Sequence, residues 1–164
     1  MSTGPKARRS TASTAKVPGV NGQLDSLDFV RASLASVQTN IFIADTKLTL
    51  IFANQKALQT LRGLEGEIRK AFKIEVDDIV GGSIHRFHKD PRAVEQILRS
   101  PAALPHNVDF TFGTVTLKTR INGIFDPRRE LLGYIVNWED VTEQRRVENE
   151  QARLMSMLEN CRPT

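Results

Sequence analysis

The sequence changes from a strand to a helix within Gly133-Tyr134-Ile135-Val136-Asn137-Trp138-Glu139-Asp140-Val141-Thr142. Alternate side chains of a strand point to the same face, so Tyr134, Val136 and Trp138 share one side. The acidic pair Glu139-Asp140 follows, and the helix dipole favours carboxylates at a helix N-terminus. This segment therefore predicts a strand with one buried face that leads directly into a polar helix beginning at Val141.

Four other stretches also predict strands: two alternate apolar and polar side chains, and two are short apolar runs. Residues 108–112 and 115–122 alternate apolar and polar side chains across a turn at Gly113-Thr114. Apolar runs at 41–44 and 48–53 are separated by a short turn, which predicts a hairpin. Together with the strand that ends at Trp138, they predict a five-stranded antiparallel sheet that is buried on one face.

Helical spacing predicts the remaining elements. Leu27, Val30 and Leu34 recur with a period near 3.6, which predicts an amphipathic helix over 24–38, with Asp25 or Ser26 as N-cap. A short helix is expected at 55–61 after the cap residue Asn54, and Gly63 and Gly66 are expected to interrupt it. Further short helices are expected around 68–74, at 76–80 and at 91–98. Helices packed on one face of an antiparallel sheet form an α+β fold.

Length and charge indicate one domain with tails. The chain has 164 residues, and residues 1–22 carry four basic side chains and no acid, whereas the remainder has 19 of each sign. We expect a disordered tail over 1–23, a folded domain over 24–140, and a terminal helix and tail over 141–164. No apolar run spans a bilayer or resembles a signal peptide, so we expect a cytoplasmic protein that binds neither membrane nor nucleic acid.

The order of elements and several local sequences resemble a PAS domain over roughly residues 24–145. The resemblance rests on Ile43-Ala44-Asp45, Ile51-Phe52-Ala53-Asn54 and the segment from Gly133 to Thr142, whose last three residues are typical of the exit into a PAS signalling helix. Within the family, Phe87-His88-Lys89-Asp90-Pro91 and Val136-Asn137-Trp138-Glu139 are similar to the PAS modules of bacterial chemoreceptors. Some of those modules are haem-based oxygen sensors, so the resemblance implies a sensor in signal transduction.

The resemblance to these sensors implies a site for haem b that senses oxygen or another diatomic gas. By motif match, His88 falls on the position of the iron ligand and Trp138 on the position that donates an indole N–H to the gas. Neutral imidazole is a good ligand for haem iron, and indole offers a donor with no acceptor. The residues expected to bind the cofactor are His88, Trp138, His85, Val136, Phe87 and Leu117, with His88 as the metal ligand.

Other side chains are expected to complete the haem site. Apolar walls would come from the phenylalanines and from Ile43, Leu50, Val94, Ile97, Leu117 and Val136. The haem propionates would pair with Lys89, Arg86, Lys118 or Arg120.

Alternative sites remain open around the two histidines. His85, three residues before His88, is a second candidate for the iron ligand. A zinc site would need a third ligand, for which only Asp90 or His106 is available. The single cysteine, Cys161, lies outside the domain, which excludes the cysteine-dependent flavin and coumarate photoreceptors. The helix at 91–98 lacks a histidine, which excludes the rhizobial type of haem sensor.

The second interpretation is a cofactor-free PAS module that dimerises and docks a partner protein. The homodimer would form through residues 24–38 and 141–160, which carry apolar stripes. No phosphate loop, nucleophile elbow or metalloprotease motif is present, so the chain is not expected to be an enzyme. The chain stops at Thr164 without an output domain, so it would signal to a partner in trans or form part of a longer protein.

Overall fold

The computed structural model describes residues 21–161. The chain divides into two units, with the boundary between Ser33 and Leu34. The described part of the first unit contains α1 (Asn21–Leu24) and most of α2 (Leu27–Ser36). Most of the predicted disordered tail, residues 1–20, lies outside the described residues.

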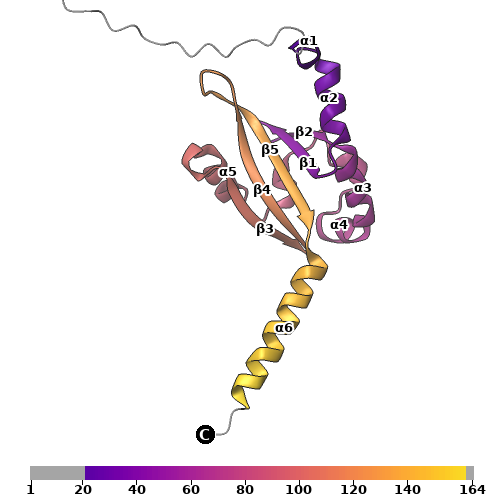
Figure 1. Cartoon of the computed structure of the whole chain (residues 1–164), viewed down its shortest axis with the longest axis vertical. Helices are drawn as coiled ribbons and strands as arrows, with labels where there is room; N and C mark the ends of the chain where they lie inside the picture. Colours follow the sequence, from indigo (N-terminus) through magenta and orange to yellow (C-terminus); the bar gives the residue numbers. More distant parts are fainter. Residues whose placement is uncertain (1–20, 162–164) are drawn as a thin grey trace, which may run out of the picture. The chain divides into compact units, whose positions relative to one another are not determined.

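The second unit contains a five-stranded antiparallel sheet with the strand order β2-β1-β5-β4-β3 (Figure 1). The strands are β1 (Asn40–Asp45), β2 (Leu50–Ala53), β3 (His106–Phe112), β4 (Val115–Phe125) and β5 (Leu131–Asp140). The two hairpins β1–β2 and β3–β4 lie on either side of β5, which pairs with β1 and β4. The predicted α+β fold and its antiparallel sheet are confirmed.

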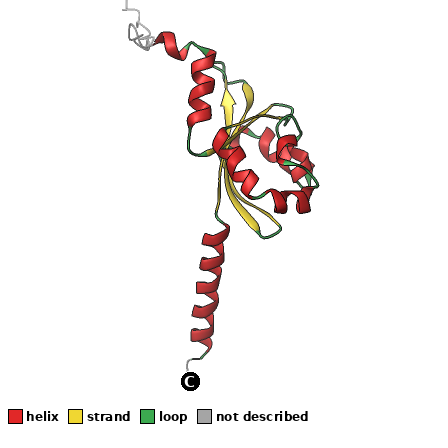
Figure 2. Ribbon diagram, turned by 90° about the vertical axis from the view of Figure 1, so that its right-hand side faces the viewer, coloured by secondary structure: helices red, strands yellow, loops and turns green. Residues whose placement is uncertain are grey.

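Short helices between β2 and β3 cover one face of the sheet (Figure 2). They are α3 (Gln55–Gly63), α4 (Glu65–Phe72), α5 (Pro91–Arg99) and the 3₁₀ helices η1 (Val76–Asp78), η2 (Ile84–Phe87) and η3 (Pro101–Ala103). The main core lies between this layer and the inner face of the sheet and includes Leu61, Ile68, Leu117 and Trp138. The chain then continues from β5 into α6 (Thr142–Asn160).

The N-terminal helix differs from the single helix predicted over 24–38. The chain breaks at Asp25-Ser26, because the Ser26 hydroxyl caps α2 by accepting the Phe29 N–H at 3.4 Å. Ser26 was one of the two predicted caps, and α2 ends at Ser36, two residues early. No side chain of α2 is buried; Leu27, Phe29 and Val30 are exposed, and Leu34 is partly buried.

Several other boundaries differ from the prediction. The predicted second strand began at Leu48, but Leu48 has φ 64° and belongs to a turn that the Asp45 carboxylate stabilises by accepting two backbone N–H groups. Helix α3 ends at Gly63, two residues after the predicted end at Leu61, and Gly66 lies inside α4 instead of interrupting it. Strand β4 extends to Phe125 because its pairing with β5 continues to Leu131.

Asn54 joins the start of α3 to the sheet. Its side-chain oxygen accepts the N–H groups of Ile41 and Ala57 at 3.0 Å each, and its amide donates to the carbonyls of Val37 and Thr39. The side chain is almost fully buried; its bonds to Ile41 and Ala57 are buried, and those to Val37 and Thr39 are partly buried. Asn54 therefore acts as the predicted N-cap and also fixes the entry into β1.

Replacing this residue tests its structural role. We expect Asn54→Ala to lower the free energy of unfolding by about 3 kcal/mol, because buried N–H and carbonyl groups lose their partners. The neighbouring Gln55 is exposed, so Gln55→Ala is the matched control and should change stability little. Urea denaturation of both variants measures the effect, and equal midpoints would contradict it.

Candidate functional site

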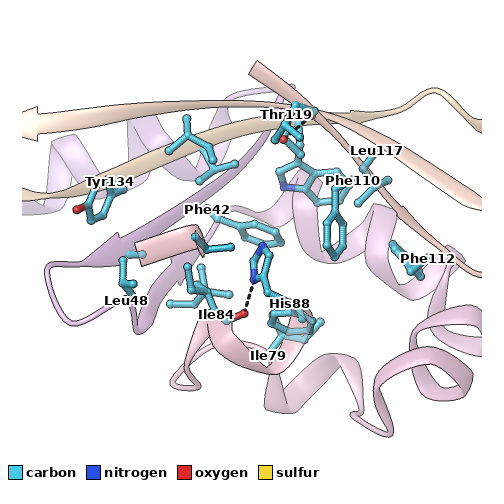
Figure 3. A pocket seen from close by; sticks show the side chains of 18 of the residues that line it. Phe42, Leu48, Ile79, Ile84, His88, Phe110, Phe112, Leu117, Thr119 and Tyr134 are labelled. Carbon is cyan, nitrogen blue, oxygen red and sulfur yellow. Dashed lines mark hydrogen bonds between the residues drawn. The ribbon is translucent and has the colours of Figure 1, made fainter. Parts of the chain in front are cut away.

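A cavity of about 170 Å³ lies between the sheet and the short helices. Its walls come from all five strands and from α3, α4, α5 and the segments around η1 and η2 (Figure 3). Nearly all lining side chains are apolar, and none of the described lining residues is Lys, Arg, Asp or Glu. The cavity therefore offers an apolar environment in which any polar atom has a large effect.

His88 is the C-cap of η2 and projects into this cavity beside Phe42 and Phe110 (Figure 3). Its Nδ1 lies 2.8 Å from the carbonyl oxygen of Ile84. Since a carbonyl only accepts, Nδ1 must carry the proton. In the neutral ring, Nε2 then has a free lone pair, and the Ile84 hydrogen bond fixes both the tautomer and the orientation of the ring.

Trp138 is buried on β5 and also lines the cavity. Its ring centroid lies 5.2 Å from that of Phe42, and its Nε1 has no hydrogen-bond partner among the described residues. A buried indole N–H usually has a partner. The unpaired donor therefore marks a position where a ligand acceptor would be stabilised.

The other predicted site residues fall into two groups. Phe87, Leu117 and Val136 line the same cavity as His88 and Trp138. His85 does not line it, because its Nε2 pairs instead with Glu95 Oε1 of α5 at 2.9 Å. This geometry favours His88 over His85 as a ligand within the cavity.

The pair of His85 and Glu95 connects η2 to α5. Glu95 also lies 3.4 Å from Arg99, and a second polar contact, from Tyr134 Oη to the Leu98 carbonyl at 3.0 Å, holds α5 to the sheet. The sequence did not indicate either contact, because no local pattern around His85 or Tyr134 shows which distant residue each side chain will contact. Together they close the side of the cavity that η2 and α5 form.

The expected walls and charged partners are only partly in place. Leu50 and Val94 line the cavity, whereas Ile43 and Ile97 do not. Lys118 and Arg120 alternate with the cavity-lining residues of β4, so they lie on the opposite face of the sheet. These two residues cannot reach a propionate in the cavity.

The remaining two cations lie near the cavity wall. Arg86 donates to the carbonyl oxygens of Asp78 and Ile79 and lies over the Phe87 ring, which fixes it as a structural residue. Lys89 follows His88 directly and is exposed. Lys89 therefore stays a predicted propionate partner.

The residues present fit a haem by their chemistry but leave less space than a haem needs. A free imidazole lone pair, an unpaired indole donor and apolar walls are suited to an iron porphyrin with a gas ligand. Pockets for drug-sized molecules start at about 300 Å³, above the 170 Å³ of this cavity. Haem would therefore require the cavity to widen.

Several contacts hold the start of the terminal helix α6 to strands β3 and β4. Thr142 Oγ1, at the start of α6, accepts the Thr116 N–H at 3.0 Å, and the Val141 N–H donates to the Thr116 carbonyl. Arg145 of α6 pairs with Asp109 of β3 at 2.7 Å, and this ion pair raises the pKa of Arg145 after the larger effect of its hydrogen bond to Glu148. The sequence predicted the helix but not these contacts.

The described residues do not form the cluster of ligands that the alternative zinc site would need. Within residues 21–161, no group of three or more His, Cys, Asp or Glu side chains is arranged to hold a metal ion. None of the helices in the described part of the chain is long and apolar enough to cross a membrane.

No protein-family model matches the sequence. A search of curated proteins finds the methyl-accepting chemotaxis protein McpB of Pseudomonas aeruginosa, which is 28% identical over 127 residues, or 77% of this chain. The matched region is 19% of that receptor, so the chain spans about a fifth of its length.

Solved structures share the fold. The Aer2 receptor from Vibrio cholerae, described as a dual PAS-haem oxygen sensor, aligns with a TM-score of 0.59 and 27% identity, covering 63% of this chain and 94% of that one. An RNA-binding light-oxygen-voltage receptor aligns with a TM-score of 0.57 and 14% identity, covering 90% of this chain and 42% of that one, and supports the fold alone.

The contact between His85 and Glu95 can be tested directly. We expect Glu95→Ala to raise amide hydrogen exchange at His85, Arg86 and His88 roughly fivefold, because losing one hydrogen bond of about 1 kcal/mol loosens η2. Gln96 is exposed on the same helix, so Gln96→Ala is the matched control. Unchanged exchange in Glu95→Ala would show that this contact does not hold η2.

Proposed function

We propose that this chain, which has the PAS fold and resembles the PAS modules of bacterial chemoreceptors, is a sensory module that binds haem b and detects oxygen or another diatomic gas. In this proposal, His88 holds the cofactor and Trp138 binds the gas. A partner protein receives the signal through α6.

The unpaired Nε1 of Trp138 is the observation that supports this proposal most strongly. Trp138 and His88 line the same cavity, and the Ile84 hydrogen bond leaves Nε2 of neutral His88 with a lone pair. Haem, when bound, supplies the iron at which a gas molecule is held. The relative described as a PAS-haem oxygen sensor, with 27% identity, adds independent support.

In this proposal, each residue of the site has a separate role. The Ile84 carbonyl keeps the proton on Nδ1 of His88, so Nε2 is available as a ligand without further proton transfer. The apolar walls exclude water, and Trp138 donates one hydrogen bond to charge that develops on the gas. In this proposal, Lys89, which follows His88 in the sequence and is exposed, pairs with a propionate carboxylate.

The position of Trp138 provides a route to α6. Trp138 and Thr142 are joined by three residues at the end of β5, and Asp140 Oδ1 accepts the N–H of Thr142 at 3.0 Å. A gas that binds more tightly to one position of the indole than to another would therefore bias the start of α6.

An absorption spectrum tests the cofactor. We expect protein purified from haem-supplemented cells to show a Soret band that shifts on reduction and on addition of CO, and we expect His88→Ala to lose it. His106, on β3, does not line the cavity, so His106→Ala is the matched control and should keep the band. No band in the wild-type protein, or full retention in His88→Ala, would contradict the assignment.

The gas-binding residue has its own test. We expect Trp138→Phe to keep the Soret band but to release oxygen about 10- to 100-fold faster, because a hydrogen bond to a charged acceptor contributes about 1.5–3 kcal/mol. Stopped-flow dissociation measures the rate. An unchanged rate in a variant that still carries haem would remove Trp138 from gas binding.

A dimerisation module is the second candidate function, and exposed apolar side chains favour it. Leu154 and Leu158 lie one turn apart on α6 and are 51% and 67% exposed, while Leu27 on α2 is 62% exposed. Such side chains are suited to a helix from a second copy. The two functions are compatible, because the cavity and these stripes use different residues.

Light scattering coupled to size exclusion tests this second candidate. We expect the wild-type chain to be a dimer at micromolar concentration and Leu154→Glu with Leu158→Glu to be a monomer, because paired carboxylates cannot be buried in a helical seam. Gln151 is exposed on the same helix, so Gln151→Glu controls for added charge. A wild-type monomer would contradict dimerisation through α6.

A further inference from the structure

The haem-free cavity has a size and polarity of its own. An apolar cavity of about 150 Å³ in another protein stays dry and binds benzene, and the cavity here measures about 170 Å³. Phe42, Phe110 and Phe112 line it and offer ring faces and edges to an aromatic guest. Volume alone therefore selects a molecule with a single six-membered ring.

Several polar atoms in the wall remain available to such a guest. The hydroxyl of Thr119 donates to the Val108 carbonyl at 2.7 Å, and that of Tyr134 donates to the Leu98 carbonyl, so both have used their one donor and keep only acceptor capacity. Trp138 Nε1 can only donate and has no partner among the described residues, whereas Nε2 of neutral His88 can only accept. The lining residues thus include one donor without a partner, Trp138 Nε1, and an imidazole acceptor at His88 in addition to the two hydroxyl oxygens.

We propose that the haem-free chain binds a small uncharged phenol in this cavity, with the hydroxyl accepting from Trp138 and donating to His88. A hydroxyl is the simplest group that both accepts and donates, whereas an ether or carbonyl only accepts. The guest is neutral, because the described lining contains no charged side chain to compensate a phenolate. The proposal does not depend on haem binding, and a phenol and haem would exclude each other.

Binding of a series of ligands to the wild-type protein tests the phenol site without any mutation. Calorimetric titrations of haem-free protein, prepared without imidazole, compare phenol with anisole and toluene, which have similar shape but lose the donor or both polar functions. We expect phenol to bind about tenfold more tightly than toluene, with anisole between them. Equal affinities for phenol and toluene, or no saturable binding of phenol, would overturn the proposal.

Variants then assign the two hydrogen bonds. Trp138→Phe and His88→Phe should each weaken phenol binding roughly threefold to tenfold and leave toluene within twofold. In His88→Phe, phenol and anisole should become equal, because both then only accept from Trp138. His106→Phe is the control outside the cavity. If all variants retain the wild-type preference for phenol, the ligand binds elsewhere and the assignment fails.

Haem separates this proposal from the proposed function. If haem binds, adding it should release phenol stoichiometrically, because both would occupy the cavity between His88 and Trp138. Retention of phenol in haem-saturated protein would overturn the shared site. If haem does not bind, the proposed function fails while the ligand series still decides the phenol site.

Discussion

β5 is the strand on which the sheet depends, because its backbone pairs with β1 on one side and with β4 on the other. Without it, the sheet would separate into the hairpins β1–β2 and β3–β4, and isolated hairpins are marginally stable in water. Gly133 permits this close pairing, since a Cβ there would lie 2.5 Å from the Ala44 carbonyl oxygen. The same strand carries Val136 and Trp138 into the cavity, so the sheet and the site share one structural element.

Local patterns predicted the sheet well because the information for it is local. Alternation along β3, β4 and β5 indicated which face is buried, and Gly113-Thr114 indicated the turn between two of them. The ends of strands were less predictable, since Phe125 remains in β4 only because Leu131 pairs with it. Leu48 was assigned to a strand because its own residue type does not show that the Asp45 carboxylate stabilises a turn there.

The candidate site divides in the same way. The sequence predicted that His88 and Trp138 would face one pocket, and Leu117 was among the predicted wall residues that line it. The strand period excludes Lys118 from the inner face of the sheet, which the prediction overlooked. Contacts such as the bond from Asn40 Nδ2 to the Trp138 carbonyl join residues 98 positions apart, and nothing in either local sequence indicates them.

The length of α6 has a mechanical consequence for whatever binds its far end. Its 19 residues rise about 1.5 Å each, so the helix is about 28 Å long. Its first turn is held to the sheet through Thr116 and the pair of Asp109 and Arg145. A tilt of about 5° at this base would move the opposite end by about 2.5 Å, roughly half the pitch of a helix. α6 is thus a lever arm that converts a small displacement near β5 into one large enough to change how side chains interlock.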